Sequence, residues 1–358
     1  MKRPLMMVLA VLLLTTAAGA VELPDDLREA LPKAAEDMLE NLEFSGEDGF
    51  IQGIGRITAQ VQSQLGSFVR KSVQGVASVL LVVVLCGAGE GFSNSFGQKE
   101  HTYLQMIGAL SISLLTAGSL DSLIGLGAET IQDLSLFSKV LLPTLAAATA
   151  TSGALVTATV QQVTTVFLVD VLLNLISVGL LPVVYLYIGT LTASCCLRDS
   201  RLELIADGLK KGVSWVLTVV MMGFTVYLSV VQIVSGAADA TKVKLTKNAI
   251  SGAVPVVGKI IADAAETVLA GAGMLKNTVG IFGMLAIFAV CIHPFVQLGV
   301  QYLLYKFTAF LAGVIGTPGL CRLINGLGSV FGLVLGMTGA CALLLLVSIL
   351  ASVAAVMP

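Results

Sequence analysis

Long apolar runs along the chain predict a protein built from membrane-spanning helices. An α-helix needs about 20 mostly apolar residues to cross the hydrocarbon core of a bilayer. Six runs of this kind are present, at 75–93, 104–127, 165–197, 213–235, 279–312 and 328–355. The sequence therefore predicts an all-α, polytopic helical membrane protein with about six spans, or eight if two more polar segments also cross.

Four prolines fall at marked places in this pattern. Pro182 and Pro294 lie near the middle of the two longest apolar runs, and Pro143 and Pro255 each precede a more polar segment. Proline lacks the backbone N–H, and its ring clashes with the preceding helical turn, so it kinks or breaks a helix. We therefore expect a helix break or hinge at each of the four positions.

The order of elements around these prolines also predicts an internal duplication. Each pair of prolines, equally spaced, is followed by a long apolar run, a short polar loop and a closing span. We predict membrane repeats at 140–235 and 253–355, preceded by a first membrane hairpin at 75–135. In the last span, glycines recur at four-residue steps, which predicts close helix packing by Gly328, Gly332 and Gly336.

Two segments are too polar for a helix that faces lipid. Residues 144–162 are rich in hydroxyl and amide side chains, and residues 256–277 carry three charges on one helical face. Each charge exposed at the centre of a bilayer would cost about 2.5 to 3.5 kcal/mol. We therefore expect re-entrant or interior helices at a transport site, the alternative being amphipathic helices at the interface. The candidate transport face comprises Lys259, Asp263, Glu266, Thr151, Ser152, Gln161 and Asp170.

The N-terminal region reads as an export signal followed by an acidic segment. Lys2 and Arg3 precede an apolar stretch that ends in Ala18-Gly19-Ala20, which predicts a signal peptide over 1–20. Mass spectrometry of the mature N-terminus tests this cleavage. Residues 21–74 are predicted to form an acidic, extracytoplasmic, amphipathic region. Its part at 52–74 has apolar residues at helical spacing and predicts a surface helix before the first span.

Composition narrows the function classes. The 358 residues are 56% hydrophobic and only 12% charged, with 20 Lys plus Arg against 22 Asp plus Glu. A soluble domain carries about 25% charged residues. The net charge of -2 and the lack of a basic stripe argue against nucleic acid as a partner. No zinc-ligand spacing and no complete nucleotide-binding or catalytic motif is found. We therefore expect no enzyme activity, no metal and no cofactor.

Three sequence blocks carry a specific resemblance. They are VLLPTLAAATATSGA at 140–154, NLISVGLLPVVYL at 174–186 and AISGAVPVVGKIIADAAETVLAGAGMLKNTVGIFG at 249–283. With the signal peptide and the acidic region, they resemble the stage III sporulation protein AE family of endospore-forming bacteria. The resemblance implies a multi-pass subunit of the channel or secretion-like complex that joins mother cell and forespore during engulfment, in the mother-cell membrane around the forespore.

The resemblance also implies partners. These are other stage III sporulation membrane proteins, ring-forming intermembrane proteins and a cytoplasmic secretion-type ATPase, with membrane lipid around the chain and self-association left open. Two roles remain in such a complex. The chain is either a permease-like core that forms or gates a passage, or a non-conducting scaffold that anchors the ring-forming and ATPase partners.

Orientation gives a first testable prediction. With six spans, the loop 198–212, which carries Arg198, Arg201, Lys210 and Lys211, lies in the cytoplasm, as the positive-inside rule favours. An impermeant thiol reagent should therefore label cysteines introduced at 25–48 in intact cells, and those at 199–209 only after permeabilisation. The unsubstituted chain is the control. Labelling of 199–209 in intact cells would instead support eight spans.

Overall fold

The computed structural model describes seven stretches of the chain, in which every regular element is a helix. The stretches are 25–39, 46–95, 101–151, 165–197, 200–253, 258–315 and 317–354. The predicted signal peptide lies outside these described residues. In chain order the elements are α2 (Asp25–Glu29), α3 (Lys33–Leu39), α4 (Gly46–Ser95), α5 (His101–Thr151), α7 (Val166–Asn174), the π-helix η2 (Leu175–Leu180), α8 (Leu181–Leu197), α9 (Ser200–Ala253), α10 (Gly258–Ile315) and α11 (Pro318–Ala354).

The fold class predicted from the sequence is confirmed. In the described residues, six helices are long and apolar enough to cross a membrane, and each overlaps one of the predicted runs. They are Leu65–Phe92, Tyr103–Thr151, Val166–Leu197, Ser200–Val230, Asn277–Ile315 and Pro318–Val353. The protein is thus an all-α, polytopic membrane protein.

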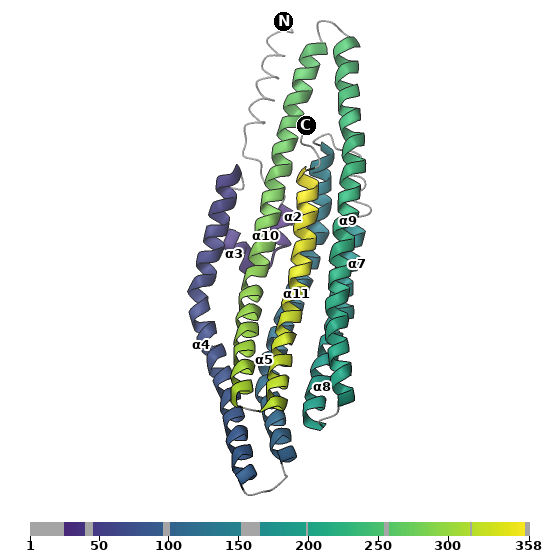
Figure 1. The fold of residues 1–358 in the computed structure, drawn as a ribbon. Coiled ribbons are helices and arrows are strands. Elements are labelled where there is room, and N and C mark those ends of the chain that lie inside the picture. Colours follow the sequence, from purple (N-terminus) through teal and green to yellow (C-terminus); the bar gives the residue numbers. More distant parts are fainter. Residues whose placement is uncertain are drawn as a thin grey trace.

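The long helices form an elongated, staggered bundle (Figure 1). The adjoining ends of α8 and α9, and those of α10 and α11, lie at one end of the bundle, called the lower end after its place in the figure. Helices α4 and α5 extend further down than these ends, and the upper parts of α9 and α10 extend beyond the end of α11. At 1.5 Å per residue, the 58 residues of α10 measure about 87 Å, against about 30 Å for the hydrocarbon core. Parts of these helices must therefore lie outside it.

The centre of the bundle is the contact between α10 and α11. Phe282 and Leu285 of α10 and Phe331 and Val334 of α11 are fully or almost fully buried. Phe282 also meets Phe137 of α5 edge-on, with 6.5 Å between ring centroids. These side chains fill the space between helices without polar groups, so this part of the interior excludes water.

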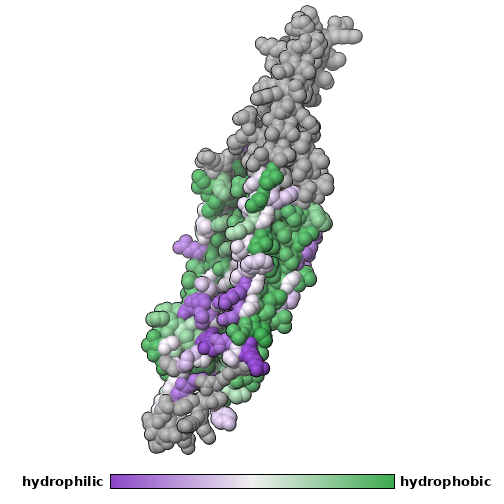
Figure 2. Space-filling model, turned by 45° about the vertical axis from the view of Figure 1, so that its right-hand side comes forward, coloured by the Kyte–Doolittle hydropathy of each residue, from purple (hydrophilic) through white to green (hydrophobic). Residues whose placement is uncertain are grey.

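The outer surface is largely apolar as well. On α9, Met222 is 66% exposed and Val226 63% exposed, and similar side chains line the outer sides of the other spans. Figure 2 shows hydrophobic residues over much of the described surface, with hydrophilic residues gathered toward the lower part of the molecule. Apolar patches of this extent are rare on soluble monomers and suit contact with lipid or with other membrane proteins.

Residues 52–74 do not form the separate surface helix that their amphipathic pattern predicted. They belong to α4, which continues without interruption into the first span. Ile57 is fully buried, and a Cβ at Gly53 would lie 2.7 Å from Cδ1 of Leu285 in α10. The apolar stripe therefore packs on protein, which removes the need for it to lie on a membrane surface.

The predicted helix breaks are not found at two of the prolines. Helix α5 continues through Pro143, and α10 continues through Pro294. Pro182 follows η2, where the N–H of Leu181 donates to the carbonyl of Ile176, five residues earlier. This wider turn lies directly before Pro182, which has no N–H to donate, and the helix continues past the proline. Pro255 lies outside the described residues, and the duplication and domain limits stay predictions.

Two of the three predicted packing glycines bring α11 close to α10. A Cβ at Gly328 would lie 3.0 Å from Cβ of Tyr305, and one at Gly332 would lie 3.0 Å from Cε2 of Tyr302. At Gly336, which is exposed, the Cβ would lie 3.9 Å from Cδ1 of Leu217 in α9. Only the first two positions therefore limit the distance between α10 and α11.

This difference predicts opposite outcomes for the same substitution. Gly328→Ala should lower the unfolding temperature of the purified protein in detergent, because the backbone-attached Cβ of Tyr305 has little room to move and overpacking costs about 1 to 3 kcal/mol. Gly336→Ala should be neutral or stabilising, since alanine favours a helix by up to about 1 kcal/mol. Equal effects of the two substitutions would contradict the close contact at Gly328.

Candidate functional site

The predicted transport face is not assembled within the described residues. Lys259, Asp263 and Glu266 lie in the upper part of α10, and the structure does not describe their side chains. This part of α10 reaches beyond the end of α11 (Figure 1). Ser152 and Gln161 lie outside the described residues. Thr151, the last residue of α5, donates its hydroxyl to the carbonyl of Ala148 at 2.9 Å and is exposed.

The two polar segments also differ from the separate helices predicted for them. Residues 144–151 continue α5, and residues 258–277 are continuous with the membrane span of α10. Neither described part is a re-entrant helix, because no break separates it from the adjoining span. The predicted pairing of Lys259 with Asp263 stays a prediction, which sporulation of single and double alanine variants would test.

Asp170, the remaining candidate, has a partner on another helix. Its Oδ1 lies 3.3 Å from Nζ of Lys139 in α5, and its Oδ2 accepts from Nδ2 of Asn174 at 3.4 Å. The ammonium is not aligned for a hydrogen bond to Oδ1, so the contact is one of charge. More than a third of each side chain is exposed. Asp170 therefore links α5 to α7, and sequence spacing gave no sign of a partner so distant in the chain.

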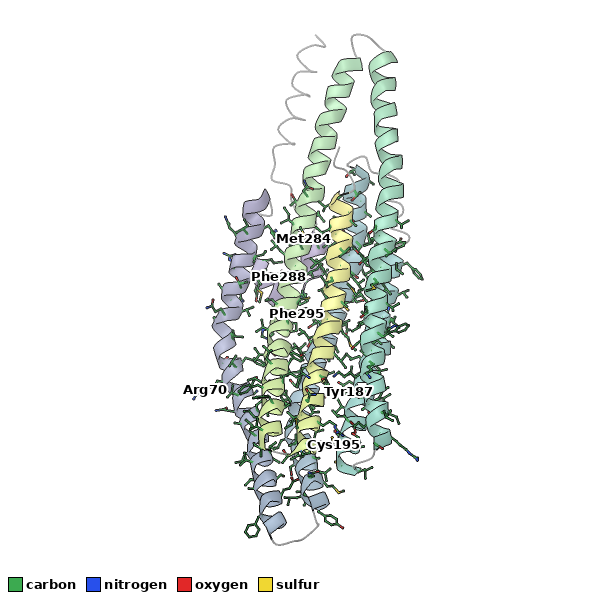
Figure 3. All side chains as sticks on the ribbon, viewed as in Figure 1. Arg70, Tyr187, Cys195, Met284, Phe288 and Phe295 are labelled. Carbon is green, nitrogen blue, oxygen red and sulfur yellow. The ribbon has the colours of Figure 1, made fainter. Side chains whose placement is uncertain are left out.

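A second set of polar contacts joins helices near the lower end. Arg322 of α11 pairs with Glu203 of α9, and the hydroxyl of Tyr187 in α8 donates to the carbonyl of Gly326 at 3.3 Å. Figure 3 places Tyr187 in the lower half of the bundle, above Cys195. These contacts connect three helices at one level, close to the basic residues that follow the α8–α9 connection.

Two lysines converge at this level. Nζ of Lys210 in α9 donates to Oγ of Ser329 in α11 at 3.0 Å. Nζ of Lys306 in α10 donates to the same oxygen at 3.1 Å and to Oδ1 and the carbonyl oxygen of Asn325 at 2.6 and 3.3 Å. We call Lys210, Lys306, Asn325 and Ser329 the lysine cluster. The sequence indicated it only by placing one lysine near the end of a long uncharged run.

The helices α4 and α5 carry charges at the level where the other spans have none. Gly53 and Gly87 of α4 lie against Leu285 and Ile315 of α10, so Arg70, halfway between them, lies beside the middle of the α10 span. Arg70 and its neighbour Lys71 are exposed, and in Figure 3 Arg70 points away from the bundle.

Glu129 of α5 lies at a similar height. Gly127 of α5 is in contact with Val334 in the middle of α11, and Glu129, one half-turn further, is exposed. Asp121, also exposed, borders a cavity of about 180 Å³ that is lined by Thr116, Leu120, Tyr185 and Leu327. By contrast, the runs 171–197, 212–238, 277–305 and 323–354 contain no Asp, Glu, Lys or Arg.

The described interior offers little for catalysis or metal binding. No group of three or more His, Cys, Asp and Glu side chains among the described residues could hold a metal ion. The six cysteines are free, and His293 meets only Gln297, at 2.6 Å between the two Nε2 atoms, among its described neighbours. Buried hydroxyls such as those of Thr308 and Thr338 donate to carbonyls of their own helices. The ion pairs among the described residues thus join partly exposed side chains.

These features define a polytopic α-helical membrane protein with a largely apolar described core and charges on its outer faces. Residues 35–356 match the family described as stage III sporulation protein AE, and the chain belongs to that family. The resemblance drawn from the sequence is therefore confirmed. Stage III sporulation protein AE of Bacillus subtilis (strain 168) is 24% identical over 245 residues, which cover 67% of this chain and 61% of that protein. The match thus spans less than two thirds of the relative. No solved structure matches the chain.

The ion pair at Asp170 gives a testable prediction. Replacing Lys139 by Met and Asp170 by Asn, singly and together, should give a coupling of about 0.2 to 1 kcal/mol in unfolding of the purified protein, because both side chains are partly exposed. The pair Lys139→Met and Asp121→Asn is the matched control and should be additive. Additivity at Lys139 and Asp170 would contradict the ion pair.

Proposed function

We propose that this chain is an integral membrane scaffold of the complex that joins mother cell and forespore during sporulation. Membership of the stage III sporulation protein AE family supports a role in sporulation, and the six apolar helices support a multi-pass place in the membrane. In this role the chain sits in the mother-cell membrane around the forespore and holds ring-forming and ATPase partners on either side.

One observation supports the choice of a scaffold. Helices α4 and α5 carry charged residues at the height where the other membrane helices are uncharged. The charged residues Arg70, Lys71 and Glu129 lie beside the uncharged middle of α10 and α11. Exposing each to the centre of a bilayer would cost about 2.5 to 3.5 kcal/mol. Further down, the exposed side chains of these two helices are apolar, among them Leu85 and Phe92. A protein partner can cover both parts, whereas lipid suits only the second.

Exposed basic residues near the lower end support an orientation for the scaffold. Near the lower end, Arg201, Lys211 and Arg322 are exposed, and by the positive-inside rule this end faces the cytoplasm and the ATPase. The short helices α2 and α3 before the first span carry exposed acids, including Glu36 and Asp37. They would face the space between the membranes, where ring-forming proteins lie.

A permease-like core is the second candidate. The same exposed charges on α4 and α5 favour it, because charged side chains at membrane level can also line a water-filled passage. The packed contact between α10 and α11 leaves no such passage there, so it would run along α4 and α5, between copies of the chain or between the chain and a partner.

Photo-crosslinking in sporulating cells tests the scaffold. A photoreactive residue at Lys71 or Glu129 should give protein adducts, and one at Met222, an exposed apolar position of α9, should give few. Glu129→Lys should lower sporulation and partner co-purification at unchanged protein level, because it reverses a charge in the proposed contact.

Thiol labelling in a cysteine-free variant of the protein distinguishes the permease-like core from the scaffold. Cysteines at positions 71 and 129 should react with an impermeant thiol reagent only if the α4–α5 face lines water, and a cysteine at 222 is again the control. Labelling at 71 and 129 without protein adducts would overturn the scaffold and support a permease-like passage. Adducts without labelling would exclude a water-filled passage at these positions.

A further inference from the structure

The two ammonium groups of the lysine cluster form no ion pair with a described carboxylate, although the exposed Asp207 lies one turn before Lys210 in α9. Both ammonium nitrogens contact the single oxygen of Ser329 and therefore lie within about 6 Å of each other. The ion pairs between described residues, Lys139–Asp170 and Arg322–Glu203, include neither lysine. Charges of like sign at this distance repel, most strongly where protein displaces water. An anion bound between them would remove this repulsion.

The hydrogen bonds of the cluster leave room for such an anion. Ser329 donates to the carbonyl of Asn325 at 3.0 Å and accepts from both lysines, and the hydroxyl of Tyr187 also lies beside it. Lys306 directs its ammonium to Asn325 and Ser329. Lys210 contacts only Ser329 among the described residues, and an ammonium has three donors. Two N–H groups of Lys210 are thus available, and exposed Asn325 leaves the cluster open to the outside.

The residues around the lysine cluster indicate that the anion belongs to a lipid headgroup. Lys210 and Lys306 lie where the uncharged runs of α9 and α10 end, which is the level of lipid headgroups. One turn nearer the membrane centre, the ring of Tyr302 faces Lys306, with 5.6 Å between its centroid and Nζ, and Trp215 of α9 is 68% exposed. Tyrosine and tryptophan are enriched at this depth of a membrane. Phe307 and Leu303 of α10 are also exposed and would contact acyl chains.

We propose that the lysine cluster binds the phosphate of an anionic phospholipid. Lys210 donates to the phosphate oxygens and Lys306 adds its charge, while Ser329 and Asn325 hold the two ammonium groups in place. Because the side chains of the cluster come from α9, α10 and α11, the lipid would fasten these helices together at the lower end. Basic pockets between membrane helices commonly bind lipid phosphate in this way.

The test uses the purified full-length protein in nanodiscs of phosphatidylcholine with increasing phosphatidylglycerol. Phosphatidylglycerol should raise the unfolding temperature of the wild-type protein. Lys210→Gln or Lys306→Gln should weaken its apparent binding about fivefold, and the double variant about thirtyfold, as expected for the loss of one or two lysines near a phosphate. Lys211→Gln removes a neighbouring exposed lysine and should change binding less than twofold.

Two further measurements test the proposed lipid binding. In phosphatidylcholine alone, Lys210→Gln should raise the unfolding temperature, because it removes the repulsion, and this also shows that the variant folds. Inorganic phosphate and glycerol 3-phosphate should not reproduce the effect of the lipid. An equal loss in Lys211→Gln, an equal effect of inorganic phosphate, or no response to phosphatidylglycerol would each overturn the proposal. None of these outcomes bears on the contacts of α4 and α5 with a partner.

Discussion

The close contact between α10 and α11 is the interaction on which the rest of the bundle depends. Inside a bilayer, lipid is as apolar as leucine, so helices associate through packing and interhelical hydrogen bonds rather than through hydrophobic burial. Gly328 and Gly332 supply the required surface, because the absence of a Cβ lets Tyr305 and Tyr302 approach the backbone of α11. The ring of Tyr305 then meets Phe331 edge-on at 5.1 Å. The helices α4, α5, α8 and α9 all pack on this pair.

The thickness of a bilayer is the second constraint. Leu141 of α5 lies against Gly283 of α10, which places the Lys139–Asp170 pair near that level, and the lysine cluster contains Lys306. The 23 residues between positions 283 and 306 measure about 35 Å along the helix. Two sets of charged contacts between helices thus bracket a zone close to the hydrocarbon thickness of about 30 Å. Between these two sets of contacts α8, α9, α10 and α11 are uncharged, whereas α4 and α5 carry charges.

The number and position of the spans could be predicted because hydropathy over about 20 residues reports directly on burial in lipid. Breaks at Pro143 and Pro294 were expected and are not found, because the effect of a proline depends on neighbouring helices that support the interrupted turn. The Lys139–Asp170 contact and the lysine cluster could not be predicted at all. Each joins residues far apart in the chain, and helical spacing relates only residues within a few turns.

The position of the charges along α10 explains how one helix carries both a polar face and a membrane span. A zone of about 30 Å that begins at Lys306 ends some 20 residues earlier, near position 286. Lys259, Asp263 and Glu266 lie more than four turns beyond that point, in the part of α10 that reaches past α11 (Figure 1). These charges need no partner in the interior of a single chain if the helix carries them out of the hydrocarbon. Among the described residues, the contact between α10 and α11 is packed and apolar, and charged side chains are exposed near the lower end and along α4 and α5.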